Sequence, residues 1–191
     1  ICVGGDFIQH IPQMTAARTK HSTYDYSESL QYVAPMFRDA DVAIINFETT
    51  ITRSRAYSGY PTFKSPIELA DALVYIGVDI ALLANNHCLD GGAVGLTTTI
   101  EEFNRRNIAH TGAFSSLDDY AQNKILYFER NGIRFALFNY TYGVNSFRPV
   151  RPQRVNFTNR EAILRDISTI NRDSVDCLIA CMHWGTEYQR V

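Results

Sequence analysis

Two carboxamides and an imidazole follow directly on an apolar segment in the middle of the chain. Residues 78–84 read Val-Asp-Ile-Ala-Leu-Leu-Ala, and Asn85, Asn86 and His87 come next, followed by Asp90 and two glycines. In α/β proteins, sites form beyond the carboxyl ends of parallel strands, where loops hold polar groups on a rigid sheet. Asn and His at such a point could ligate a divalent metal and place a proton donor or acceptor beside it.

The same residues also admit a structural interpretation. Asn86 and Asp90 could cap the helix that follows, and His87 could be a hydrogen-bonded residue of the core. Asp90 could instead orient His87 through its second ring nitrogen, as carboxylates do behind metal-bound histidines. Asn85 could either satisfy backbone groups at the strand end or contact a substrate.

Other strand-like segments end in residues of the same kind. These residues are Asp6, Asn46 with Glu48, and His183 with Glu187. Taken singly, each has a structural explanation, such as a turn for Asp6 or an arginine partner for Glu48. Because the carboxyl ends of parallel strands meet at one edge of a sheet, we expect the set to form one site. Carboxylate, carboxamide and imidazole ligands suit Zn, Mn or Fe, and such ions activate water for attack on a phosphoryl or acyl group.

The composition is that of a globular domain. The chain has 191 residues, 46% of them hydrophobic, and a formal net charge of −2. That length predicts a single domain, and the nearly neutral charge argues against a nucleic-acid binder that works through bulk positive charge. No apolar run reaches the roughly 20 residues that span a bilayer. The four cysteines show no metal-binding spacing, so we expect buried free thiols.

Strand and helix patterns alternate along the chain, which predicts an α/β fold. The expected strands cover residues 1–3, 41–48, 78–84, 124–129, 133–140 and 177–182. The expected helices cover residues 26–37, 67–76, 97–107 and 160–172. Residues 49–66 and 141–158 are expected to be loops. Asn131 and Gly132 predict a β-hairpin between two of the strands.

Several motifs, in this order along the chain, resemble the CapA family of bacterial poly-γ-glutamate capsule biosynthesis proteins. They are Gly-Asp at 5–6, Asn-Phe-Glu-Thr at 46–49, Tyr-Pro-Thr-Phe-Lys-Ser-Pro at 60–66, the segment 77–92, and His-Trp-Gly-Thr-Glu-Tyr at 183–188. The resemblance implies a metallophosphatase-like β-sandwich flanked by helices, in α-β-β-α layers. It also implies that residues 1–191 are one domain of this type, the N-terminal part of a longer domain that is incomplete at its C-terminus.

The resemblance implies roles for individual residues. Asp6, Glu48, Asn86 and His183 match metal-ligand positions, and His87 matches the histidine that faces the leaving group. Two departures from the phosphatase pattern stand out. Ile8 occupies the place of an imidazole in the first motif, and Glu48 replaces a shorter Asp. These departures leave open a single ion, weak binding or loss of hydrolysis.

The resemblance implies a metal-dependent, hydrolase-like site that acts in capsule polymer biosynthesis. The alternative is a non-catalytic module that binds the polymer or a membrane synthase, and a weaker one is a phosphatase for a small phosphoester. The candidates for substrate contact are Asn46, Asn85, Lys64, Glu187 and Arg151. A cationic rim for polyglutamate could include Arg148, Arg151, Arg154, Lys64 and Arg53, although all could equally be solvated loop charges.

The resemblance also bears on the surroundings of the protein. An extracytoplasmic, membrane-associated origin is implied, with an anchor or signal upstream of Ile1 that this sequence lacks. A sandwich that stops after Val191 would leave an open sheet edge, and open edges promote pairing with another chain. We therefore expect a possible homo-oligomer, which light scattering would test.

Overall fold

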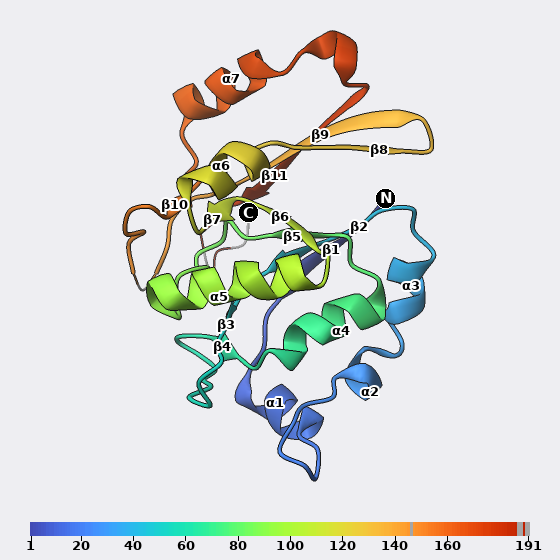
Figure 1. Cartoon of the computed structure of the whole chain (residues 1–191), viewed down its shortest axis with the longest axis vertical. Coiled ribbons are helices and arrows are strands. Elements are labelled where there is room, and N and C mark those ends of the chain that lie inside the picture. Colours follow the sequence, from blue (N-terminus) through green and yellow to red (C-terminus); the bar gives the residue numbers. More distant parts are fainter. Residues whose placement is uncertain (146, 187–188, 190–191) are drawn as a thin grey trace.

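Four short apolar strands run parallel in the first sheet, in the order β1-β2-β5-β6. The structure is a computed structural model and describes residues 1–145, 147–186 and 189. The strands are β1 (Cys2–Phe7), β2 (Ala43–Phe47), β5 (Ile80–Leu82) and β6 (Ala109–Thr111). Figure 1 shows them side by side in the middle of the molecule. The predicted strands at 1–3, 41–48 and 78–84 all contribute to this sheet.

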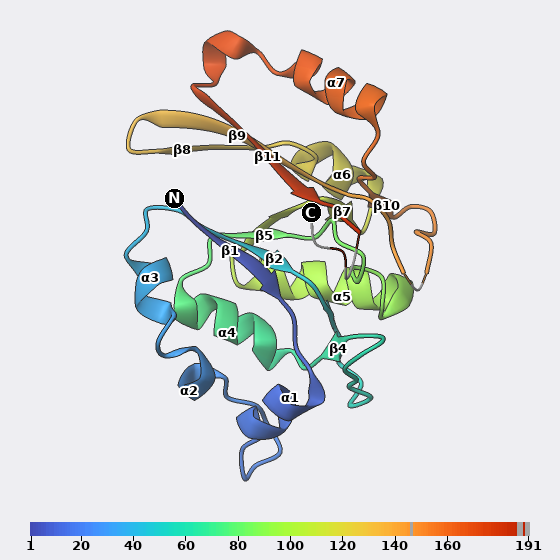
Figure 2. The ribbon, with the colours of Figure 1, turned by 180° about the vertical axis from the view of Figure 1, so that it is seen from behind.

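The second sheet has the order β11-β9-β8. Its strands are β8 (Leu126–Arg130), β9 (Ile133–Thr141) and β11 (Cys177–His183). The predicted hairpin is confirmed, because β8 and β9 pair antiparallel around Asn131 and Gly132, whose φ angles are 54° and 77°. β11 runs parallel to β9, and Figure 2 shows it crossing in front of the hairpin.

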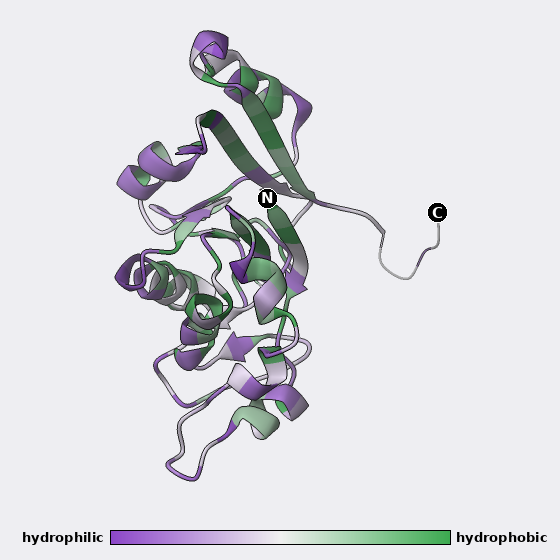
Figure 3. Ribbon diagram, turned by 90° about the vertical axis from the view of Figure 1, so that its right-hand side faces the viewer, coloured by the Kyte–Doolittle hydropathy of each residue, from purple (hydrophilic) through white to green (hydrophobic). Residues whose placement is uncertain are grey.

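Alternate side chains on the strands divide the core into layers. Ile45 and Phe47 of β2 pack among the helices below the first sheet, whereas Ile44 packs toward Leu137 of the second sheet. Phe138, the next residue after Leu137 on β9, faces the opposite way and packs with the helix at 160–169. The result is the expected order of helices, sheet, sheet and helices, and Figure 3 shows the hydrophobic strands between the more polar helices.

Helices α4 (Glu68–Ile76) and α5 (Gly92–Arg105) cover the outer face of the first sheet, and α7 (Arg160–Thr169) covers that of the second. The smaller helices are α1 (Ile11–Ala17), α2 (Ser27–Leu30), α3 (Ala34–Arg38), α6 (Leu117–Asn123) and the 3₁₀ turn Arg172–Ser174. No helix among the described residues is long and apolar enough to cross a membrane.

The prediction of one helix over 26–37 was wrong. The structure has two short helices there, and the second begins at Ala34 with Pro35 in its first turn. Proline has no N–H to donate and clashes with the preceding turn, so it starts a helix better than it continues one. The helix expected at 97–107 begins earlier, at Gly92. Two glycines in its first turn lower the helical propensity there, so the sequence did not indicate this start.

The two predicted loops contain short strands. β3 (Thr50–Ile51) pairs with β4 (Lys64–Ser65), and β10 (Arg154–Val155) pairs with β7 (Ala113–Phe114). Two-residue strands are too short to show a periodic pattern in the sequence. They anchor both loops close to the carboxyl ends of the main strands.

Candidate metal centre

Three potential metal ligands from different strands meet at one end of the two sheets. Asp6 lies on β1, Glu48 directly follows β2, and His183 is the last residue of β11. One ligand atom of each lies within 4.8 Å of the corresponding atoms of the other two. The backbone explains part of this approach, because Asp6 pairs with Asn46 across the sheet and Glu48 N donates to Phe7 O at 3.1 Å.

Asn86 completes this group from the loop after β5. Its Oδ1 lies 2.9 Å from His183 Nε2, and Glu48 Oε1 lies 3.9 Å from the same nitrogen. Together these side chains line a pocket of about 410 Å³, with Tyr142 and Trp184 on its wall. The structure thus brings together Asp6, Glu48, Asn86 and His183, the residues that the sequence proposed as metal ligands.

The amide of Asn46 supports these ligands from inside the protein. Its Nδ2 lies 2.7 Å from Asp6 Oδ1, 3.0 Å from Glu48 Oε2 and 3.4 Å from His183 Nδ1. One buried NH₂ group therefore faces an atom of each of the three side chains. Such supporting hydrogen bonds fix the orientation of metal ligands and tune their basicity.

Asn85 fixes the orientation of Asn46. The Asn85 Nδ2 donates to Asn46 Oδ1 at 3.1 Å and to Phe47 O at 2.9 Å, which turns the Asn46 NH₂ toward the carboxylates. The Asn85 Oδ1 accepts from His87 N at 3.1 Å. Both asparagines are buried. Their contacts favour a positioning role over the substrate contact that we expected for them.

Asn139, near the end of β9, links the second sheet to the segment after β5 beside this group. Its Oδ1 accepts from Ala84 N at 2.6 Å, and its Nδ2 donates to Cys181 O at 3.2 Å. Gly112 packs against the same amide with a φ of +101°, and a Cβ at Gly112 would collide with Asn139 Oδ1 and lie 2.6 Å from Ala84 N. The loop that carries Asn86 and the strand that carries His183 are therefore tied to one side chain.

His87 occupies a different environment. Its Nδ1 lies 2.7 Å from Asp90 Oδ2, which also accepts from Phe63 N at 2.7 Å, and its ring packs edge-on against Phe63. The other nitrogen, Nε2, lies 3.4 Å from Asn145 Nδ2. His87 is buried and is not among the described residues that line the 410 Å³ pocket.

The contacts of Asp90 decide between its two proposed roles. The N-cap of α5 is Gly91 and has no side-chain cap, so neither Asn86 nor Asp90 caps the helix as the structural interpretation supposed. Asp90 instead accepts a hydrogen bond from the Nδ1 of His87.

The cysteines are a separate matter. Burial raises the pKa of the thiol of Cys88, the neighbour of His87, to about 12. All four cysteines are free, as expected, although only Cys88 is fully buried.

The remaining candidates for substrate contact lie apart from one another. Lys64 is on β4, and Arg151 lines a separate pocket with Arg53. Arg148 lines a third pocket, beside Phe157. The arginines do not form the single rim that the sequence suggested. Glu187 lies outside the described residues.

Two features of the site have little signal in the sequence. Tyr142 stacks on the His183 ring with centroids 6.0 Å apart and an interplanar angle of 14°. Asn139 interrupts the apolar run Phe-Ala-Leu-Phe at 135–138, and a polar residue at this point of a buried strand was the available signal.

The family model for the bacterial capsule synthesis protein PGA_cap matches residues 1–191. The chain belongs to this family. A PGA_cap relative from Bacillus subtilis, the PGA biosynthesis protein CapA, is 30% identical over 163 residues, which cover 83% of this chain and 42% of the relative. The capsule biosynthesis protein CapA of Bacillus anthracis is 26% identical, with 83% and 40% covered. The chain thus spans about two fifths of the length of the curated relatives that it matches.

A solved structure from Staphylococcus aureus, described as a 5′-nucleotidase in complex with α-ketoglutarate, superposes on the chain with a TM-score of 0.59. The two are 15% identical, and the alignment covers 98% of this chain and 37% of the other. At this identity the likeness shows the fold alone. It confirms the predicted metallophosphatase-like α/β fold for this member of the PGA_cap family.

The donor set of this PGA_cap chain fits a divalent cation. Two carboxylates, one imidazole and one carboxamide oxygen form a mixed oxygen and nitrogen set of the kind that Mn, Zn or Fe accept. Three of the four ligand residues lie on a strand or directly after one. The residues present therefore could hold such an ion.

Proposed function

We propose that this chain carries a divalent-metal-dependent, hydrolase-like centre that acts on an anionic polyamide, such as poly-γ-glutamate, during capsule synthesis. The convergence of Asp6, Glu48 and His183 within 4.8 Å is the observation that carries the proposal. The class of polymer in this proposal is suggested by the family and by the names of the relatives.

Asp6, Glu48, Asn86 and His183 would hold the ion. A divalent cation there would supply Lewis-acid chemistry and polarise a phosphoryl or amide carbonyl group. Asn46 keeps the carboxylates turned toward the pocket, and the ring of Tyr142 restrains His183 from the other side. Trp184, which is largely exposed on the pocket wall, offers an apolar surface to the methylene groups of a substrate.

His87 would accept and donate a proton as a general base and acid. Asp90 accepts from Nδ1, so the neutral ring holds its proton at Nδ1 and keeps Nε2 as the basic atom. Asn145 faces Nε2 at 3.4 Å, which is longer than a strong hydrogen bond. Displacement of the Asn145 side chain by a substrate would let Nε2 accept a proton and later donate it to a leaving group.

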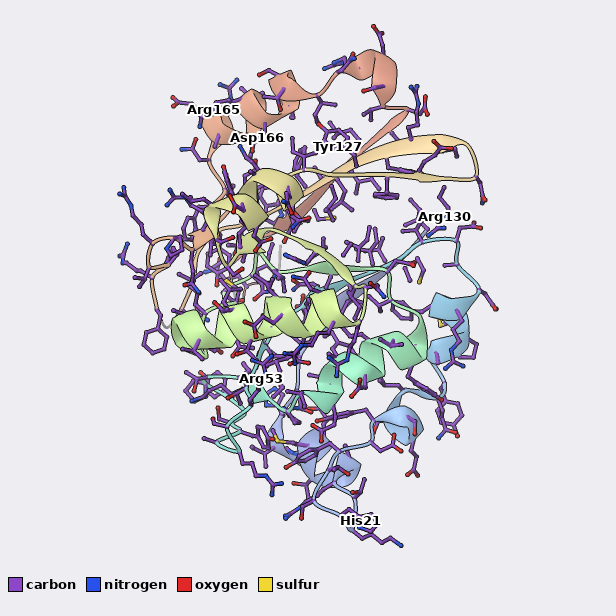
Figure 4. All side chains as sticks on the ribbon, in the orientation of Figure 1. His21, Arg53, Tyr127, Arg130, Arg165 and Asp166 are labelled. Atoms are coloured by element: carbon purple, nitrogen blue, oxygen red, sulfur yellow. The ribbon has the colours of Figure 1, made fainter. Side chains whose placement is uncertain are left out.

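Metal binding tests the centre directly. Metal-free full-length protein would be titrated with Mn²⁺, Zn²⁺ and Fe²⁺ by calorimetry, and bound metal would be counted by inductively coupled plasma mass spectrometry. We expect stoichiometric metal in the wild type and its loss in Glu48→Gln and His183→Ala. His21→Ala is the matched control, because His21 is exposed at the far end of the molecule (Figure 4). Equal metal in all four proteins, or none in any, would refute the proposal.

The second candidate is a non-catalytic binding module of the same synthesis machinery, with the polymer or a membrane synthase as partner. Its support is the burial of His87 outside the pocket lining and the single imidazole among the described ligand residues. Metal binding without hydrolysis of γ-linked glutamate oligomers would favour this candidate. Hydrolysis that depends on the added metal would favour the first.

We further propose that residues 1–191 are the N-terminal part of a longer domain with an extracytoplasmic, membrane-associated setting. The longer domain is supported by the share of the relatives that the chain covers and by the position of β1 and β11 at open edges of the described sheets. The setting is supported by the names of those relatives, which are capsule biosynthesis proteins. Pairing of such an edge with a second copy remains a prediction. Light scattering at several protein concentrations tests it.

A further inference from the structure

A second pocket, of about 360 Å³, lies between the first turns of α5 and the segment before β10. Val150 contributes an exposed apolar surface. The polar residues of the pocket lining are Arg53, Thr97, Thr98, Glu101, Ser115, Arg151 and Gln153. No described residue is shared with the lining of the candidate metal centre. The volume falls within the range of roughly 300–1,000 Å³ in which small-ligand sites are found.

The buried side chain of Gln153 has an acceptor oxygen without a hydrogen-bond partner among the described residues. Its Nε2 donates to Ala93 O at 2.7 Å and to Thr97 Oγ1 at 3.3 Å, which fixes the amide against α5. Its Oε1 is buried and has no hydrogen-bond partner among the described residues. Buried polar atoms are nearly always satisfied, so this oxygen calls for an N–H or O–H donor. Because Gln153 lines the pocket, a ligand bound there could supply this donor.

The pocket is lined by two arginines and one glutamate, and among its described residues only Arg151 carries a charge that is not paired. Arg53 is committed to α5, where it forms ion pairs with Glu101 at 2.7 Å and Glu102 at 2.6 Å, and Figure 4 shows it beside that helix. Arg151 is exposed, and among the residues that the structure describes it has no ion pair. Its guanidinium is therefore available for a carboxylate, which it can bind through two parallel hydrogen bonds.

We propose that this pocket binds one glutamyl-amide unit of an anionic polyamide, with the carboxylate on Arg151 and the amide N–H on Gln153 Oε1. The methylene groups of the unit lie against Val150. The choice of polymer rests on the proposed function, whereas the pairing of a carboxylate with an amide N–H comes from the pocket itself. A site apart from the metal centre would hold the polymer while another of its bonds occupies the centre.

A short γ-linked glutamate oligomer is the probe, titrated by calorimetry in metal-free buffer. Arg151→Gln should weaken binding by about tenfold, because a charge-assisted contact is lost. Arg148→Gln is the matched control, since it removes the same charge from the same loop but lines a different pocket, and it should change binding by less than about twofold. Equal losses in both variants, or none in either, would overturn the proposal.

The amide contact needs its own test. Polyacrylate with the same number of carboxylates lacks N–H groups and should bind about fivefold more weakly than the glutamate oligomer. The side-chain amide signal of Gln153 in nuclear magnetic resonance spectra of the wild type should shift with the oligomer but not with polyacrylate. Gln153→Met should remove the preference for the oligomer. Equal affinity for both polymers would overturn the assignment of Gln153 and with it the proposed unit.

The two proposals can fail separately. Oligomer binding that persists in His183→Ala but weakens in Arg151→Gln supports the pocket, whether or not the centre binds metal. Binding that is lost in His183→Ala and unchanged in Arg151→Gln assigns the polymer to the metal centre and overturns the pocket.

Discussion

His87 lies in the loop after β5 and His183 ends β11, at the same end of the two sheets, yet their rings are held in different ways. His183 lines the 410 Å³ pocket, with Asn86 Oδ1 at 2.9 Å from one ring nitrogen and the Asn46 amide at 3.4 Å from the other. His87 is buried, with a carboxylate on Nδ1 and Phe63 against its ring. The first ring faces possible ligands of a cation, and the second faces a proton acceptor.

This difference separates binding from proton transfer. The surroundings of His183 are amides and carboxylates, which orient its ring or could share a cation with it. The surroundings of His87 fix one tautomer and leave Nε2 toward Asn145, which is a suitable arrangement for a general acid or base. The predictions that follow test this division, beginning with the largest effect.

Replacement of His87 should affect turnover and leave metal affinity unchanged. In His87→Gln, we expect hydrolysis of a γ-linked glutamate oligomer to fall by about 10²–10⁴-fold, the usual contribution of a positioned acid or base. Metal affinity, measured by calorimetry on the same protein, should stay within about twofold because His87 lies outside the described pocket lining. A variant that hydrolyses at the wild-type rate would remove His87 from the chemistry.

Replacement of Asn46, unlike that of His87, should weaken metal binding. Asn46→Leu removes the NH₂ group that faces Asp6, Glu48 and His183, and we expect metal affinity to fall by about 10–100-fold. Asn145→Ala serves as the control, because this amide faces His87 instead, and its metal affinity should match that of the wild type. Similar losses in the two variants would show that the two histidine environments are not separate.

A third histidine offers a reference pair away from the site. His110 Nε2 lies 2.9 Å from Asp119 Oδ1. Burial alone would raise the pKa of Asp119, but the hydrogen bonds and charge of His110, with those from Ser115 and Asn123, outweigh it and hold the pKa below its usual value. The ionised carboxylate thus stabilises the fold above an ordinary Asp pKa of about 4, and this contribution is lost as the pH falls through the lowered pKa.

Asp119→Asn should therefore lower the free energy of unfolding by about 1–3 kcal/mol at pH 7, with a smaller difference near pH 3. Urea unfolding at both values measures it. Asp118→Asn is the matched control, since Asp118 is exposed in the same first turn of α6 and its replacement should change little. A difference that grows toward low pH would contradict the assigned direction of the pKa shift.

The smallest expected effect concerns Cys88, the neighbour of His87. Because burial raises the pKa of its thiol to about 12, the thiol stays protonated near neutral pH. We expect iodoacetamide at pH 8 to modify Cys88 only after the protein unfolds, and peptide mass spectrometry can follow each cysteine. Rapid modification in the folded protein would mean that the His87 region opens readily.

The sequence was sufficient to predict which residues could gather at the site. Apolar segments that end in Asp6, Glu48, Asn86 and His183 are visible without a structure, and the parallel-strand rule places such ends together. The orientation of an amide is different, since it depends on partners far away in the sequence. Asn46 is oriented by Asn85, 39 positions later, and its role as a positioning residue therefore could not be read from the chain.

The fold shows the same limit. Strands with apolar runs were predicted well, and the turn at Asn131 and Gly132 revealed the β8–β9 hairpin. Helices of four to seven residues such as α1 and α6 were missed because they span too few turns to be periodic. Ser116, which accepts from Asp119 N at the start of α6, was a capping signal that could have revealed that helix. The arginines at 148, 151 and 154 looked like one group because sequence proximity says nothing about which way a loop turns.

A substitution at Gly112, which is not itself a candidate ligand, would disturb the positions of the ligand residues. Any side chain there would displace the Asn139 amide, which bonds to Ala84 after β5 and to Cys181 on β11. Asn86 would then shift relative to His183 even though every ligand kept its identity. A family member with an intact set of ligands but another residue at this position would be expected to have lost the centre. The identity of the four ligand residues alone therefore does not predict which homologues could hold an ion.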